Sequence, residues 1–136
     1  MLVLVKASAS SEAGAMPSTD LLEAMGRFNE ELAAAGVLTA GEGLKPSVAG
    51  LRVGFNGEDR SVTEGPFDLG PGLVAGFWIW EVRDMAEALA WARRCPPPMP
   101  DGGELELRPV YDLADFGDAV SPELAEQEAR LRAVTL

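Results

Sequence analysis

The hydrophobic residues of this chain follow two spacings, which alternate from segment to segment along the sequence. Short runs with alternating apolar residues predict strands, and apolar residues three or four positions apart predict helices. Helices are expected to begin at Asp20, at Asp84 and at Ser121-Pro122, with the first ending at Gly36 and the second before Pro96. The strands are expected at residues 1–7, 37–44, 51–55, 60–64, 74–82 and 104–110.

Local signals support these boundaries. Asp20 and Asp84 each precede a glutamate by three positions, which is the spacing of a capping box. Asn56-Gly57 lies between two short alternating segments and predicts the tight turn of a β-hairpin, because both residue types tolerate positive φ angles. The segment 65–72, rich in glycine and proline, predicts a loop.

The order of the elements predicts an α+β fold. Two β-α-β units with a hairpin between them correspond to a ferredoxin-like β-α-β-β-α-β sheet with an extra hairpin, and both main helices are then expected on one face. The strand at 74–82 carries Phe77 and Ile79 on one face and Trp78 and Trp80 on the other. Helices on one side leave an apolar face uncovered, so we predict a homodimer in which a partner's sheet covers it.

Length, net charge and composition limit the classes of function that the chain can have. The 136 residues predict one domain, with 112–136 as a C-terminal extension that contains a short helix. The net charge of −11 makes direct nucleic-acid binding unfavourable, and no apolar run is long enough for a membrane span, so a cytoplasmic location is expected. The chain contains no histidine and one cysteine, Cys95, to which we assign a packing role. We therefore expect no metal, no cofactor and no Ser-His chemistry.

Six blocks of sequence, in order and spread over most of the chain, resemble the YCII-related family and specifically its DGPF branch. The blocks are 25–32 (MGRFNEEL), 40–46 (AGEGLKP), 64–67 (EGPF), 75–80 (AGFWIW), 91–96 (WARRCP) and 108–111 (RPVY). The resemblance implies a dimeric α+β barrel, in which two ferredoxin-like sheets face each other across a cleft. The activity of the family is largely unknown. The genes of the DGPF branch often neighbour those of sigma factors, which implies a possible sigma-factor association.

The sequence departs from the family pattern in three places. The related YciI branch is suspected of acid/base chemistry through a His-Asp pair, but the position of that histidine falls near Met25 here. Glu64 replaces the aspartate of the DGPF motif, and residues 68–72 (DLGPG) replace the charged segment that usually follows. The suspected pair of the YciI branch is therefore absent.

Two carboxylates are the candidate catalytic residues. Glu42 lies between two glycines on a predicted strand, and Glu64 ends the hairpin beside a proline. If either faces the cleft between two sheets, loss of solvent makes it a candidate general base. The alternative is structural: Glu42 as a residue of an ion pair and Glu64 as a turn cap, and this is the preferred interpretation of both.

The candidate ligand-binding residues are aromatic and basic. Phe67 and Trp78, together with Trp80, are candidates to line an apolar pocket, with Lys45 or Arg108 as its polar anchor. The alternative for the aromatic residues is packing in the core of the dimer, which is the preferred interpretation.

Three classes of function follow. The first choice is a homodimer that binds a small organic molecule, as a binding or regulatory module. The second is a metal-independent isomerase or lyase with Glu42 as general base. The third is a protein-interaction module, in which the acidic surface and the C-terminal helix dock a basic partner such as a sigma factor. An apolar cleft with a converging acid and cation favours the first two, and an exposed apolar patch beside Leu124 and Leu131 favours the third.

Overall fold

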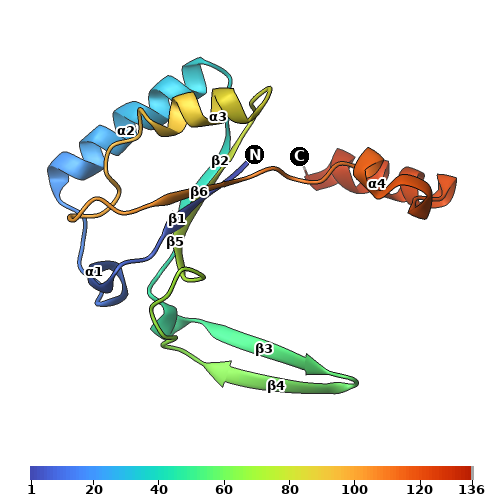
Figure 1. Ribbon diagram of the computed structural model, residues 1–136, viewed down its shortest axis with the longest axis horizontal. Coiled ribbons are helices and arrows are strands. Elements are labelled where there is room, and N and C mark those ends of the chain that lie inside the picture. The colour runs from blue at the N-terminus through green and yellow to red at the C-terminus, as the bar shows by residue number, and fades with distance from the viewer. Residues whose placement is uncertain (136) are drawn as a thin grey trace.

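The computed structural model of the chain describes residues 1–135, and its elements follow the predicted order (Figure 1). The strands are β1 (Leu2–Lys6), β2 (Leu38–Gly43), β3 (Leu51–Asn56), β4 (Asp59–Glu64), β5 (Val74–Trp80) and β6 (Leu105–Arg108). The α-helices are α1 (Ala9–Glu12), α2 (Thr19–Ala34), α3 (Met85–Ala92) and α4 (Pro122–Thr135), and the 3-10 helices are η1 (Ser47–Ala49) and η2 (Leu113–Ala119).

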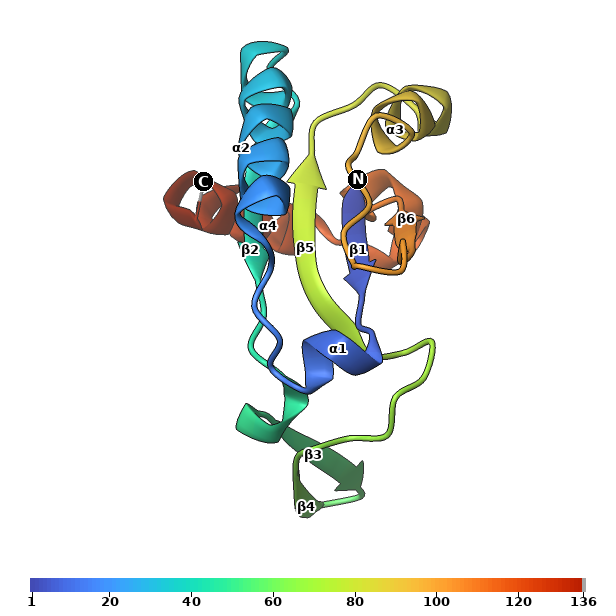
Figure 2. The same cartoon turned by 90° about the vertical axis from the view of Figure 1, so that its left-hand side faces the viewer.

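Four strands form one antiparallel sheet in the order β2-β5-β1-β6. Helices α2 and α3 both lie on one face of this sheet (Figure 2). This arrangement is the ferredoxin-like topology, so the predicted α+β fold is confirmed. The predicted extra hairpin is also present, as the separate two-stranded sheet β3–β4.

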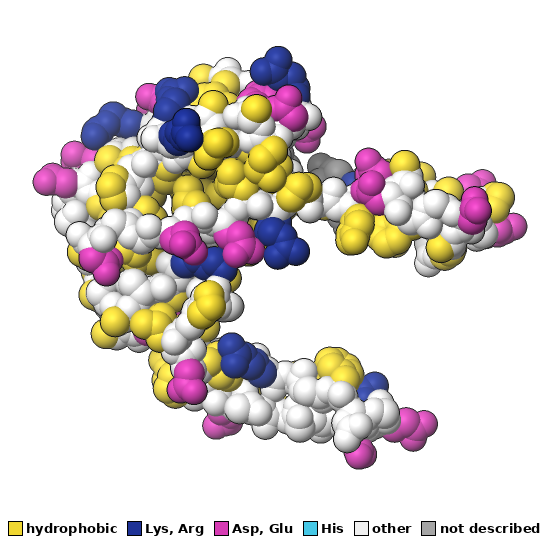
Figure 3. Space-filling view, viewed as in Figure 1, with side chains coloured by type: hydrophobic (Ala, Val, Ile, Leu, Met, Phe, Trp, Pro, Cys, Tyr) yellow, Lys and Arg dark blue, Asp and Glu magenta, His cyan; other side chains and the backbone are white. Residues whose placement is uncertain are grey.

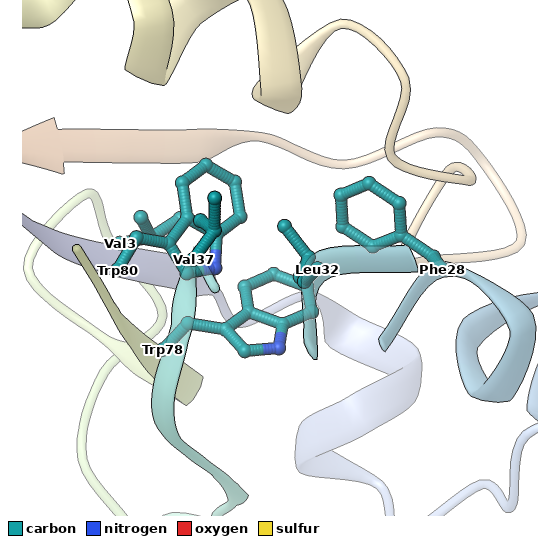
Figure 4. Packing of buried hydrophobic residues seen from close by; sticks show 6 residues of the cluster. All are labelled: Val3, Phe28, Leu32, Val37, Trp78 and Trp80. Carbon is teal, nitrogen blue, oxygen red and sulfur yellow. The ribbon is translucent and has the colours of Figure 1, made fainter. Parts of the chain in front are cut away.

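The core lies between the sheet and the two helices (Figure 4). Trp78 and Trp80 point from β5 toward Phe28 of α2, and the ring centroid of Phe28 lies 5.9 Å from that of Trp78 and 6.2 Å from that of Trp80, both at edge-on angles. Leu32 and Val3 are completely buried beside them. Alternation along β5 therefore places Phe77 and Ile79 on the opposite face.

The helix boundaries confirm two predictions and correct one. Asp84 caps α3, since its carboxylate accepts a hydrogen bond from the backbone N–H of Glu87 at 2.9 Å, and Gly36 follows α2 with a φ of 73°. Asp20, however, lies inside α2. The N-cap of α2 is Ser18, two positions before the predicted cap. Its hydroxyl accepts a hydrogen bond from the backbone N–H of Leu21 at 3.1 Å. A serine hydroxyl and an aspartate carboxylate serve equally well as caps, so the capping pattern alone did not decide between them.

The hairpin turn also differs in detail from the prediction. Asn56 pairs with Asp59, so the two turn residues are Gly57 and Glu58 rather than Asn56 and Gly57. Only Gly57 has a positive φ, of 61°, which fits a turn with glycine at its first central position.

Two arms project from the sheet, on the side away from α2 and α3 (Figure 1). One arm is the hairpin β3–β4, in which every residue is exposed. The other, which we call the C-terminal arm, is η2 with α4. No helix within residues 1–135 is both long and apolar enough to cross a membrane.

Candidate functional site

The face of the sheet opposite α2 and α3 brings together apolar and charged side chains, and we call it the open face. Strand register places its residues in two rows, because paired residues of antiparallel strands point to the same face. The first row is Ala40, Ile79, Leu2 and Arg108, and the second is Glu42, Phe77, Leu4 and Glu106.

The middle of the open face is apolar. Leu2 and Leu4 of β1 pair with Ile79 and Phe77 of β5, and these four residues form what we call the apolar strip. Ile79 keeps 37% of its surface exposed, although it is a large aliphatic residue on a central strand. The other three residues are half-buried. Neither main helix covers this strip, since both pack on the other face (Figure 2).

The β6 edge of the open face carries two cations around one carboxylate. Lys6 Nζ lies 3.0 Å from Glu106 Oε1 and also donates a hydrogen bond to the carbonyl of Pro71. Arg108 Nη1 lies 3.3 Å from the other carboxylate oxygen, Glu106 Oε2. Hydrogen bonds from Lys6 and Arg108 hold the pKa of the Glu106 carboxyl below its usual value. This group is therefore an anion at neutral pH.

Sequence reasoning found Arg108 but missed Lys6 and Glu106. The signal was present: Lys6 continues the alternation of β1, and Glu106 alternates with Leu105 and Leu107 on β6. What the sequence does not give is the pairing of β1 with β6, which brings these two charges together.

Glu42 lies at the opposite edge of the open face. It pairs with Phe77, so the candidate base does share a face with Arg108. The strands β2 and β6 are three strand spacings apart, about 14 Å between backbones. Glu42 is exposed to solvent in the single chain. The open face therefore has an acid at one edge, two cations at the other and apolar residues between.

Trp78 lies on the other side of the sheet. Its ring is buried in the core, and its Nε1 donates a hydrogen bond of 2.9 Å to Asn29 Oδ1 on α2. The structure therefore does not bring Trp78 together with Glu42 and Arg108. Its position agrees with the packing alternative, although in the core of one chain rather than of a dimer.

The remaining predicted residues lie toward the hairpin. Glu64 is the last residue of β4 and pairs with Leu51, and Lys45 is exposed just after β2. Phe67 is half-buried at the base of the hairpin, where the guanidinium carbon of Arg52 lies 3.9 Å from the centre of its ring. Glu64 and Phe67 therefore belong to the hairpin region, and not to the rows of the open face.

A hydrogen-bond cluster holds the base of the hairpin. Glu12 of α1 accepts hydrogen bonds from the backbone N–H and the hydroxyl of Ser47, and the Ser47 hydroxyl in turn accepts one from the backbone N–H of Phe67 at 2.9 Å. Gly65 packs so closely that an added Cβ would lie 1.7 Å from the Ser47 carbonyl oxygen. These contacts hold the base of the hairpin, whereas the residues of its two strands are exposed to solvent.

Cys95 lies outside the open face, and its thiol packs against the hydrophobic core. Burial raises the pKa of this thiol to about 11. Cys95 is therefore protonated at neutral pH, in agreement with the packing role assigned from the sequence. Within residues 1–135, no cluster of three or more acidic or cysteine side chains is arranged to hold a metal ion.

These features define a ferredoxin-like α+β domain with an uncovered, partly charged sheet face. The sequence model of the YCII-related domain matches residues 1–114, which is most of the chain, and the protein belongs to this family. The prediction from the six sequence blocks is thereby confirmed at the level of the family, and the DGPF branch stays a prediction. No curated protein matches the chain. The match ends within η2, so the greater part of the C-terminal arm lies beyond it.

Proposed function

We propose that this chain forms a homodimer in which the open faces of two copies pack together and bind a small organic molecule between them. The observation that carries the proposal is the apolar strip, which lies in the centre of a sheet and is bounded by charge at both edges. A sheet needs cover on each apolar face, and a twofold-related copy offers the same apolar strip in return. Charged groups at the rim of such an interface give a ligand its polar anchors.

The arms support the same assembly. Both extend past the plane of the open face and leave a gap between them (Figure 1). Hydrophobic side chains are visible on the sides of both arms that border this gap (Figure 3). In the hairpin, register puts Leu51, Val53, Phe55 and Val62 on one face, and all four are exposed. An isolated two-stranded hairpin is marginally stable in water, so this apolar face is expected to gain cover from a second chain.

Sedimentation equilibrium of two matched variants tests the dimer. Ile79 on the open face and Leu89 on α3 are 37% and 42% exposed, so aspartate disturbs a similar apolar area at each. We expect the wild type to have twice the 14.4 kDa mass of one chain. Ile79→Asp should weaken the dimer at least about a hundredfold, since it places an unpaired charge in an apolar interface. Leu89→Asp should remain a dimer.

Circular dichroism in the near ultraviolet should be nearly the same for all three proteins, because the Ile79 side chain lies on the face of the sheet opposite the buried tryptophans. A wild type that is monomeric at micromolar concentration contradicts the proposal, as does dissociation by Leu89→Asp alone.

The enzyme alternative uses the same cleft. Glu42 is exposed in one chain, so a role as general base in an isomerase or lyase requires the partner's sheet to exclude water from it. Turnover that is lost in Glu42→Gln, with the dimer and ligand affinity unchanged, would identify the protein as an enzyme rather than a binding module.

A second candidate function, docking of another protein, is favoured by the C-terminal arm. Leu124 and Leu131 of α4 are both about half exposed, and with Phe116 of η2 they line an apolar groove of about 360 Å³. A basic partner such as a sigma factor would suit the net charge of −11. Leu131→Asp separates the two roles: if the homodimer is unaffected, the groove is available to another protein, and if the homodimer dissociates, the groove belongs to the dimer interface.

A further inference from the structure

We infer that the molecule bound by the open face is an organic acid with an apolar body, whose carboxylate binds Arg108 and whose apolar body lies on the apolar strip. This inference rests on the proposed function, since the ligand occupies the cleft between two open faces. It adds the chemical class of the ligand, the residue that recognises it and the direction in which it lies.

Arg108 has more hydrogen-bond donors than its contact with Glu106 uses. A guanidinium carries five N–H donors in a planar fork that matches a carboxylate. The contact of Arg108 with Glu106 is long, at 3.3 Å, and uses one of its terminal nitrogens. The Arg108 side chain remains 67% exposed. It therefore retains donors for a second carboxylate at the rim of the apolar strip.

The charges around Glu106 do not cancel. Glu106 is already neutralised by Lys6, whose side chain is only 13% exposed and whose ammonium is shared with the carbonyl of Pro71. Two cations surround one anion, so the cluster has a net charge of +1, and the exposed member is Arg108. A protein with a net charge of −11 repels anions in general, so a local positive centre beside an apolar surface favours anions that also carry an apolar body.

The charge of Glu42 determines the orientation of the ligand on the sheet. Glu42 is an acceptor at the far edge, about 14 Å from the β6 backbone, with Phe77 and Leu4 between it and Glu106. Its charge repels a carboxylate. The ligand therefore lies with its carboxylate toward β6.

Isothermal titration calorimetry with three matched probes tests the inference on the full-length protein. Benzoate carries the ring and the carboxylate, 4-hydroxybenzoate adds the hydroxyl, and benzamide replaces the carboxylate by a neutral group of nearly the same shape. We expect benzoate to bind at least tenfold more tightly than benzamide. 4-Hydroxybenzoate should bind like benzoate, because its hydroxyl group does not reach Glu42 across the sheet.

Variants at two arginines show which side chain is responsible. Arg108→Gln should lower the affinity for benzoate at least tenfold and leave that for benzamide unchanged, and Arg108→Lys should retain part of the difference because it keeps the charge but not the fork. Arg83→Gln is the control, since Arg83 pairs with Glu87 at the start of α3 and is remote from the open face. It should bind all three probes like the wild type.

The outcomes separate this inference from the proposed function. Equal affinity for benzoate and benzamide, or benzoate binding that Arg108→Gln does not weaken, overturns the assignment of an acid but leaves a small-molecule-binding dimer. Absence of binding by all three probes overturns the inference as stated, and sedimentation equilibrium then shows independently whether the dimer exists.

Discussion

Replacing Gly41 by alanine tests how tightly the helix-facing side of the sheet is packed. Gly41 pairs with Trp78, and an added Cβ would lie 2.5 Å from Trp78 Cδ1 and 3.1 Å from Nε1. Carbon atoms in contact are normally about 3.5–4.0 Å apart, so the indole ring would have to move by about 1 Å. The ring has little freedom to do so, because it packs against Phe28 and Trp80 and is hydrogen-bonded to Asn29.

The expected cost of Gly41→Ala is about 1–3 kcal/mol of the free energy of unfolding, which is typical of overpacking a core. Loss of the hydrogen bond between Trp78 and Asn29 adds about 1 kcal/mol if the ring turns away. Gly43→Ala is the matched control: Gly43 lies two residues further on β2, and its added Cβ would meet no atom within 4 Å. Both substitutions restrict the unfolded chain alike, so the comparison cancels that effect.

Urea unfolding of the two variants, followed by tryptophan fluorescence, measures the difference. We expect Gly43→Ala to be neutral or slightly stabilising and Gly41→Ala to be less stable than it by about 1–3 kcal/mol. Equal stabilities for the two variants would refute the close contact between β2 and the Trp78 ring, and with it the packing of the core.

Two further predictions concern the hairpin base and the thiol. Gly65→Ala should disrupt the contact with the Ser47 carbonyl and destabilise the protein by about 2 kcal/mol or more, whereas Gly70→Ala, whose Cβ meets nothing within 4 Å, should not; equal melting temperatures would contradict this. Cys95 should react slowly with a disulfide reagent at pH 8, because a pKa of about 11 leaves roughly a thousandth of it as thiolate, and immediate reaction of the folded protein would show an accessible thiol. Since this pKa is raised on folding, the contribution of the thiol to stability is present below pH 9.0 and is lost as the pH rises toward 11.

The fold was predictable because the spacing of apolar residues is unambiguous in most elements. The face of β5 that meets the helices was not, since Phe77 and Ile79 are as apolar as Trp78 and Trp80. The volume of the side chains explains which face of β5 meets the helices. The two indoles fill the space under α2, and Gly41 on the neighbouring strand leaves room for one of them. The face to which a residue points therefore depends on which residues lie beside it on the adjacent strands. The sequence alone does not specify these neighbours.

The candidate site was predictable only in part, for a related reason. Glu42 and Arg108 lie on strands at opposite edges, and only the strand pairing shows that they share one face. Lys6 was placed within the predicted strand 1–7, but its partner Glu106 is a hundred positions away, and the sequence does not show that the two strands pair. Glu64 was a candidate base with a turn cap as the preferred alternative, and the structure places it at the end of β4, paired with Leu51 in the separate two-stranded sheet.

Ile79 offers the most direct test of the central claim, that two open faces pack together. It is the only isoleucine of the chain, so its δ1 methyl group gives a single unambiguous NMR signal. In a mixture of isoleucine-labelled and unlabelled chains, isotope-filtered spectra should show Overhauser contacts from this methyl group to aliphatic or aromatic protons of the other copy. A dimeric sample without any such contact, or a chain that stays monomeric, would contradict the pairing and the ligand site between the sheets.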